Sequence, residues 1–145
     1  MDIPVSSWQF WAVMSAVFAA LTALFAKVGV ESVDPDLATL IRTLIIAVIL
    51  ALMVGISGKF VALDTVSPKA WVFLSLSALA TGASWLCYFR ALKLGPASLV
   101  APVDKMSVVL VAVLAFVFLG ERPSGPNWLG LLMISGGLVL VIVRR

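Results

Sequence analysis

The sequence predicts an all-α integral membrane protein with five transmembrane helices, and three observations support this fold class. Of the 145 residues, 63% are hydrophobic and only 12% are charged, and the mean hydropathy is +1.18. Soluble domains are about half apolar and about a quarter charged. Five apolar runs also approach the length of about 20 residues, at about 1.5 Å each, that crosses the hydrocarbon of a bilayer. Short segments rich in proline, glycine and acidic residues separate these runs.

The five predicted spans cover approximately residues 8–27, 37–56, 70–92, 97–119 and 128–143. Asp34 is expected to cap the second helix, with Pro35 at the first helical position. The other breaks are Ser67-Pro68 before the third span, Gly95-Pro96 before the fourth, and the stretch GERPSGPN (120–127) before the fifth. The fifth run is the shortest, so its ends are the hardest to fix. We expect residues 1–145 to form a single transmembrane domain.

The composition argues against enzymatic chemistry and against nucleic-acid binding. The chain has no histidine and one cysteine, Cys87, so an intrachain disulfide, a histidine-based metal site and imidazole acid/base catalysis are excluded. The net charge of +3 is small and scattered, without the clustered basic face that nucleic acid requires. We therefore expect no enzyme activity, no cofactor, no metal and no nucleic-acid partner.

The tryptophans show which ends of the helices lie on the same side of the membrane. With five spans the termini face opposite sides; the N-terminal side is called side A and the other side B. Four tryptophans fall at side-A ends, where an amphipathic indole prefers the headgroup region: Trp8, Trp11, Trp71 and Trp128. Trp85 is the exception, because it lies about 10 Å from the side-B end of the third span, at about 1.5 Å per residue.

A layer of charge lies at the same depth as Trp85. The tight turn at Gly95 predicts an antiparallel hairpin of the third and fourth spans, which places Trp85 level with Asp104 and Ser84 level with Lys105. Arg42, in the second span, lies at a similar depth from side B. Tyr88 and the cations Lys27, Arg90 and Lys93 lie nearer the side-B surface, where the long cations can snorkel.

Asp104 and Lys105 need partners, since a charge deep in a bilayer usually faces a protein interior or a watery cavity. Neighbours on one helix point about 100° apart, so we expect them not to pair with each other. By depth, Arg42 is the candidate partner of Asp104, and Ser84 or Glu31 that of Lys105. Pro102 is expected to kink the helix. The layer then serves either as a transport pathway or as a purely structural ion pair.

The second half of the chain resembles a known family of transporters. The stretch YFRALKLGPASLVAPVDKMSVVLVAVLAFVFLGERPSGPNWLGLLMISGGLVLV (88–141) is similar to the later part of an EamA-type repeat of the drug/metabolite transporter superfamily, including the LGE at 119–121 and the PVDK at 102–105. The earlier ALFAKVGV (23–30) and LATLIRTLIIAV (37–48) resemble the first two helices of that repeat. The resemblance covers nearly the whole chain.

The resemblance implies a half-size carrier. Longer members carry two five-helix repeats in inverted orientation around a central site, and this chain supplies one repeat. The family cavity is lined mainly by the third and fourth helices of each repeat. This implies that the substrate pathway includes Ser84, Trp85, Tyr88, Asp104, Lys105 and Ser107; by depth, Arg42 joins them. The small multidrug exporters of the superfamily use an acidic residue in the first helix, and residues 8–26 contain none.

We therefore expect a secondary transporter of small metabolites or amino-acid-like solutes in a prokaryotic plasma (inner) membrane, working by alternating access. Its partners would be the solute, the lipid bilayer and a second copy of the chain. The alternatives are a non-transporting accessory subunit of a membrane complex and a small multidrug-like cation exporter. Lys and Arg residues number three near side A and five near side B, which fixes orientation weakly. An antiparallel homodimer is therefore expected, with a parallel dimer or a paralogous partner as the other possibilities.

Overall fold

The computed structural model describes residues 7–60 and 65–143. Every regular element in these two ranges is helical. Five segments are long and apolar enough to cross a membrane: Trp8–Val30, Pro35–Ile56, Pro68–Leu94, Ala97–Leu119 and Gly125–Val143. The predicted all-α membrane fold class is thus confirmed. By their internal contacts the helices form two compact units, Met1–Leu94 and Gly95–Arg145.

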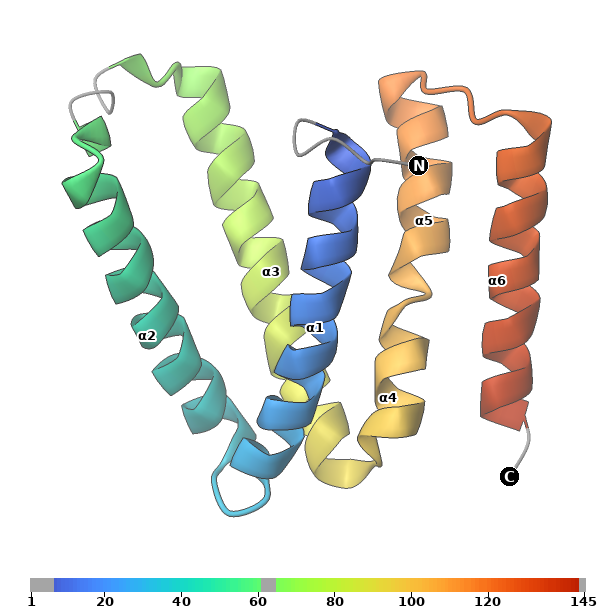
Figure 1. Cartoon of the computed structure of the whole chain (residues 1–145), viewed down its shortest axis with the longest axis horizontal. Coiled ribbons are helices and arrows are strands. Elements are labelled where there is room, and N and C mark those ends of the chain that lie inside the picture. The colour runs from blue at the N-terminus through green and yellow to red at the C-terminus, as the bar shows by residue number, and fades with distance from the viewer. Residues whose placement is uncertain (1–6, 61–64, 144–145) are drawn as a thin grey trace. The chain divides into compact units, whose positions relative to one another are not determined.

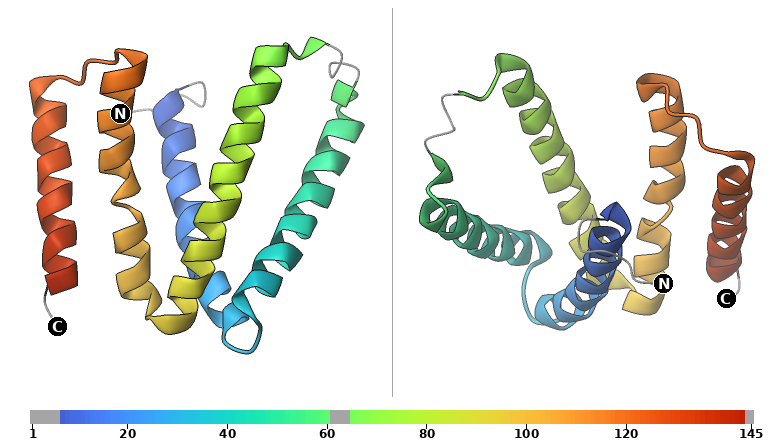
Figure 2. Two further views of the ribbon diagram at one scale, coloured as in Figure 1. Left: turned by 180° about the vertical axis from the view of Figure 1, so that it is seen from behind. Right: turned by 45° about the horizontal axis from the view of Figure 1, so that its top comes forward.

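Unit 1 holds α1 (Trp8–Val30), α2 (Pro35–Ile56) and α3 (Pro68–Leu94). α3 packs against both α1 and α2. The views in Figures 1 and 2 show the N-terminal end of α2 close to the C-terminal end of α3, and the two helices diverging toward their other ends. The side-B ends of the three helices therefore lie together, and this is where the polar side chains of unit 1 meet.

The start of α2 is fixed by local sequence, as predicted. Asp34 has an extended backbone and its Oδ1 accepts hydrogen bonds from the N–H groups of Asp36 (2.9 Å) and Leu37 (3.2 Å). Pro35 occupies the first helical position, where a missing N–H costs nothing. This confirms the Asp34 cap. It also places Asp36 in the first turn of α2, at side B.

Unit 2 begins with a span that is divided rather than continuous. It consists of α4 (Ala97–Asp104), α5 (Ser107–Leu114) and the π-helical turn η2 (Ala115–Leu119). The N–H of Lys105 donates to the carbonyls of both Ala101 (3.3 Å) and Pro102 (3.0 Å), a tightened turn that closes α4. Pro102 has no N–H and its ring crowds the preceding turn, so it weakens the helix just before the break.

The last helix, α6 (Gly125–Val143), begins three residues earlier than the run of apolar residues predicted. Gly120 ends η2 with a φ of 69°, a conformation that glycine adopts without strain. Phe116 and Trp128 then meet edge to face, with ring centroids 6.0 Å apart. The other spans also differ from prediction by only a few residues at their ends. Arg144 and Arg145 are two of the five side-B cations counted in the sequence, and they lie outside the described residues.

Candidate functional site

Two lysines close the side-B end of unit 1 by binding carbonyl groups. Lys27 Nζ donates to the carbonyl of Leu92 at 2.8 Å. Lys93 Nζ donates to the carbonyls of Val30 and Glu31, both at 2.7 Å. The last carbonyls of a helix lack intrahelical partners, so each lysine satisfies the end of the other's helix. These shallow cations are therefore occupied in joining α1 to α3.

An ion pair joins α2 to α3 at the same end. Arg90 Nε donates to Asp36 Oδ1 at 3.1 Å and Nη2 donates to Oδ2 at 2.8 Å. The two side chains are 59% and 52% exposed, so water screens the pair and its stabilising effect is modest. The two-point geometry nevertheless fixes the direction of the guanidinium. Sequence analysis missed this pair, because nothing in the sequence relates Asp36 to Arg90.

Arg42, deeper in unit 1, contacts an aromatic ring instead of an oxygen. Its Cζ lies 4.1 Å from the ring centroid of Trp85 and 5.7 Å from that of Phe89. The two aromatic residues are four positions apart on α3 and so share one face of the helix. The structure thus brings together two residues of the predicted site, Arg42 and Trp85, and adds Phe89, which sequence analysis missed. The four-residue spacing is the signal that could have found it.

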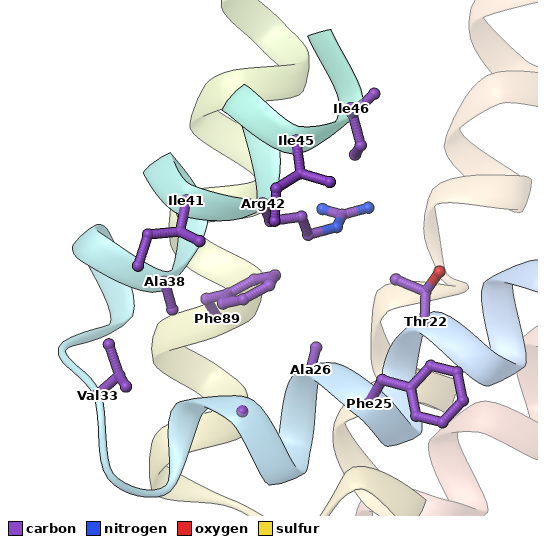
Figure 3. Close-up of a pocket in the computed structure, with 11 residues that line it drawn as sticks. Thr22, Phe25, Ala26, Val33, Ala38, Ile41, Arg42, Ile45, Ile46 and Phe89 are labelled. Carbon is purple, nitrogen blue, oxygen red and sulfur yellow. The ribbon is translucent and has the colours of Figure 1, made fainter. Parts of the chain in front are cut away.

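A pocket of about 530 Å³ opens beside Arg42, lined by α1, α2, α3 and the loop between α1 and α2. Figure 3 shows the Arg42 side chain extending from α2 into this space, across from Thr22 of α1, with Phe89 of α3 below it. Among the eleven lining residues, Arg42 carries the only charge and Thr22 the only hydroxyl; the others are glycine, alanine, valine, isoleucine or phenylalanine. The pocket is therefore an apolar cavity with one fixed positive charge.

The remaining α3 residues of the predicted site lie in the same unit. Ser84 is exposed and Tyr88 is half-buried. The Tyr88 ring meets Phe89 edge to face, with centroids 6.5 Å apart. Arg42, Ser84, Trp85 and Tyr88 thus belong to unit 1. Asp104, Lys105 and Ser107 belong to unit 2.

Asp104 and Lys105 contact each other, contrary to the expectation from helical geometry. Lys105 Nζ lies 3.3 Å from Asp104 Oδ2. That expectation assumed one continuous helix, whereas α4 ends at Asp104 and α5 begins at Ser107. Lys105 directly follows α4, with φ −70° and ψ −4°, and its long side chain reaches back to the neighbouring carboxylate. The proposed partnerships of Asp104 with Arg42 and of Lys105 with Ser84 or Glu31 stay predictions.

The described side chains offer little to a metal ion. In residues 7–60 and 65–143, no three Cys, Asp or Glu side chains gather into a group that could hold one. Besides the side-B contacts, two features stand out: the apolar pocket that contains Arg42 in unit 1, and the charged turn at Asp104 and Lys105 in unit 2. Both are suited to recognising a small charged solute inside a membrane protein.

Comparison with known proteins identifies the family. The EamA-like transporter family matches residues 6–143. An uncharacterized transporter of Sinorhizobium sp., encoded in the cobO 3′ region, is 54% identical over 137 residues, 94% of this chain and 97% of the relative. The uncharacterized transporter YxxF of Bacillus subtilis (strain 168) is 30% identical over 142 residues, 97% of this chain but 44% of the relative. No solved structure gives a significant match.

A third relative, from Methanocaldococcus jannaschii, is 27% identical over 130 residues, 90% of this chain and 92% of that protein. The chain therefore spans nearly the whole of the Sinorhizobium and Methanocaldococcus relatives and less than half of YxxF. The family, the names of the two transporter relatives and the five apolar helices agree on a multi-pass membrane transporter. The resemblance noted in the sequence is confirmed: this chain belongs to the EamA-like transporter family, in a half-size form with a single five-helix repeat.

Proposed function

We propose that the protein is a secondary carrier that moves small metabolites or amino-acid-like solutes across a prokaryotic plasma membrane by alternating access. The observation that carries this proposal is the charged break between α4 and α5, where Asp104 and Lys105 lie side by side. Lys105 and Met106 keep right-handed helical angles but form hydrogen bonds three residues back, so the span tightens into a turn here; irregular backbone at membrane depth is tolerated where it is buried in protein or lines a water-filled cavity. A break that presents both signs of charge therefore suits a polar solute.

The depth of this break supports a pathway rather than a surface feature. Asp104 is the eighth residue of α4, so it lies about 10 Å along the helix at about 1.5 Å per residue. Asp104 is too short to snorkel that distance. Discontinuous helices with polar ends near the membrane centre are a recurring device of secondary transporters. Ser107, the first residue of α5, adds a hydroxyl to the same break.

We propose further that residues 1–145 form one EamA-like domain and that the working unit is an antiparallel homodimer. The relatives' lengths support this idea, because the chain covers 97% of the Sinorhizobium transporter but 44% of YxxF. The longer protein has room for two such repeats in one chain. Two oppositely inserted copies of a single repeat would reproduce the inverted pair that transporter folds often contain.

Counterflow in proteoliposomes tests the carrier function. Purified protein is reconstituted and screened for exchange of labelled amino acids, organic acids and amines, and the active solute is then tested on Asp104→Asn. We expect the variant to lose at least tenfold in exchange rate at normal expression. Asp34→Asn is the matched control, because it removes the same charge while asparagine still caps α2.

Other results would point elsewhere. Wild-type exchange by Asp104→Asn would show that the charged break is structural. Exchange restricted to organic cations would favour a small multidrug-like exporter. No exchange of any solute, with a stable partner subunit recovered from the native membrane, would favour an accessory subunit.

A further inference from the structure

Arg42 differs from the other cations at the side-B end of unit 1. Lys27 and Lys93 donate to backbone carbonyls, and Arg90 donates twice to the carboxylate of Asp36. Within the described residues of unit 1, Arg42 forms no hydrogen bond and no ion pair; its guanidinium contacts the rings of Trp85 and Phe89 and lies within electrostatic reach of the Tyr88 side chain. Among the cations of this cluster, it is therefore the one that binds no carbonyl or carboxylate oxygen of unit 1.

The contact with Trp85 holds the guanidinium without using its hydrogen bonds. A cation–π contact is an attraction to the face of the ring, whereas the five N–H donors of an arginine require acceptor oxygens. Arginine presents these donors as a fork that matches a carboxylate in a two-point arrangement. The aromatic neighbours of Arg42 thus hold its guanidinium without occupying its N–H donors.

The depth of Arg42 argues that its acceptor is a solute rather than a lipid headgroup. Arg42 is the eighth residue of α2, which begins at Pro35, so it lies about 10 Å beyond the helix start at about 1.5 Å per residue. Headgroup phosphates lie outside the hydrocarbon region. An unneutralised charge at this depth is costly, and a small anion that enters the pocket would remove that cost.

The pocket defines the rest of the ligand. Its volume of about 530 Å³ lies within the range of small-molecule sites, about 300–1,000 Å³. The lining has no acidic side chain, so the ammonium group of a zwitterion would find no counter-charge there. The hydrophobic walls suit an apolar body, and the Thr22 hydroxyl faces the guanidinium across the space as a second polar group (Figure 3).

We propose that the pocket between α1, α2 and α3 binds a small organic monoanion, a carboxylate with an apolar body, and that Arg42 is the residue that recognises its carboxylate. Trp85 is a positioning residue that holds the guanidinium. Thr22 donates a further hydrogen bond to the anion. The inference rests on the proposed carrier function only in taking this anion to be the transported solute; binding itself has its own measurement.

Binding is tested with three probes that share a body and differ in charge: 4-phenylbutyrate, its neutral amide and the corresponding amine. The wild-type protein in nanodiscs of phosphatidylcholine is titrated with each probe, and its apparent Tm is recorded. A ligand that binds only the folded state raises the Tm. We expect a shift with the carboxylate and at least a tenfold weaker response to the amide and the amine.

Variants then test which side chains bind the carboxylate. Arg42→Gln should lose at least tenfold in affinity for the carboxylate, and Thr22→Val should lose about tenfold, as expected for one hydrogen bond to a charged group. Lys69→Gln is the control, because it removes one positive charge at side A. A variant with Trp8, Trp11, Trp71 and Trp128 replaced by phenylalanine leaves Trp85 as the single indole, and its emission should change on addition of the carboxylate.

Several results would contradict the proposal that Arg42 binds a carboxylate in this pocket. These are equal binding of carboxylate and amide, unchanged binding by Arg42→Gln, or a response that phosphatidylglycerol abolishes by occupying Arg42. If Arg42→Gln fails to fold, Arg42→Lys replaces it, and full carboxylate affinity in that variant would exclude fork-shaped recognition. Exchange losses that do not add in the Arg42→Ala/Asp104→Ala double variant would make Asp104 the anion that Arg42 binds.

The outcomes also separate this inference from the carrier function. Carboxylate binding without counterflow of any screened solute would leave the pocket as a site and remove the transport proposal. Counterflow of another solute class without carboxylate binding would keep the carrier and remove the pocket's role.

Discussion

Arg90 holds Asp36 by two parallel hydrogen bonds of 3.1 Å and 2.8 Å, which tie the last turns of α3 to the first turn of α2. The pair lies just outside the layer of Arg42 and Trp85. It therefore sets where α2 begins relative to α3, and with it the side of the pocket that α2 supplies.

Asp36→Asn should lower the stability of the protein only slightly. The pair is about half exposed, and water screens an exposed ion pair so that it contributes little to stability. Thermal unfolding in detergent should shift by a few degrees, and the Asp36→Asn/Arg90→Gln double variant should be no worse than the single ones. A shift as large as that of a core truncation would mean that the pair carries more than its exposure suggests.

Lys93→Met should be more damaging than Asp36→Asn. Lys93 Nζ lies within 2.7 Å of the carbonyls of Val30 and Glu31, and its loss leaves the end of α1 without this donor. The Glu31 contact is exposed, so water replaces it, but the Val30 contact is part-buried; a polar group that is buried without a partner destabilises the fold, so the melting temperature should fall more than in the ion-pair variant. Lys69→Met, on the opposite side of the membrane, is the control. Equal shifts for the two methionine variants would contradict the capping role of Lys93.

Pro102→Ala should slow transport without unfolding the protein. Alanine restores an N–H and favours continuation of α4 through the break at Lys105. We expect a several-fold lower exchange rate in proteoliposomes, with melting unchanged or raised. Pro123→Ala, outside the helices, should leave exchange as in the wild type. Normal exchange by Pro102→Ala would show that the shape of the break does not depend on the proline.

The predicted hairpin of the third and fourth spans places Trp85 level with Asp104. In a Cys87→Ser background, Trp85→Cys combined with Asp104→Cys should form a disulfide on mild oxidation, because each lies about ten residues from the turn at Gly95. Trp85→Cys combined with Val117→Cys should not, since Val117 lies near the far end of its span. Cross-linking of the second pair but not the first would refute the shared layer.

The antiparallel homodimer predicts two orientations in one membrane. A cysteine placed after Arg145, again with Cys87→Ser, should be labelled by a membrane-impermeant reagent in about half of the molecules in intact cells. The weak imbalance of topogenic charge, three cations against five, is the reason. Labelling of all molecules or of none would instead indicate one fixed orientation, and with it a parallel dimer or a paralogous partner.

Much of the fold could be predicted because hydropathy and helix ends are local properties. The Asp34 cap and the five spans depend on residues within a few positions of each other. The site was harder to predict. Depth along a helix gave Arg42 and Trp85 the same level, but it does not give the direction of a side chain, so their contact was not expected. The prediction that Asp104 and Lys105 do not contact each other was wrong, because it assumed regular helical geometry where the span tightens into a turn.

The polar contacts of unit 1 gather at one end of its helices. Lys27, Lys93 and Arg90 fasten α1, α2 and α3 there, whereas α2 and α3 diverge toward side A (Figures 1 and 2). The side-B contacts are therefore the natural pivot for a rotation of α2 against α3. A rotation there would displace the side-A ends most, as far as the chain segment that joins Ile56 to Pro68 allows.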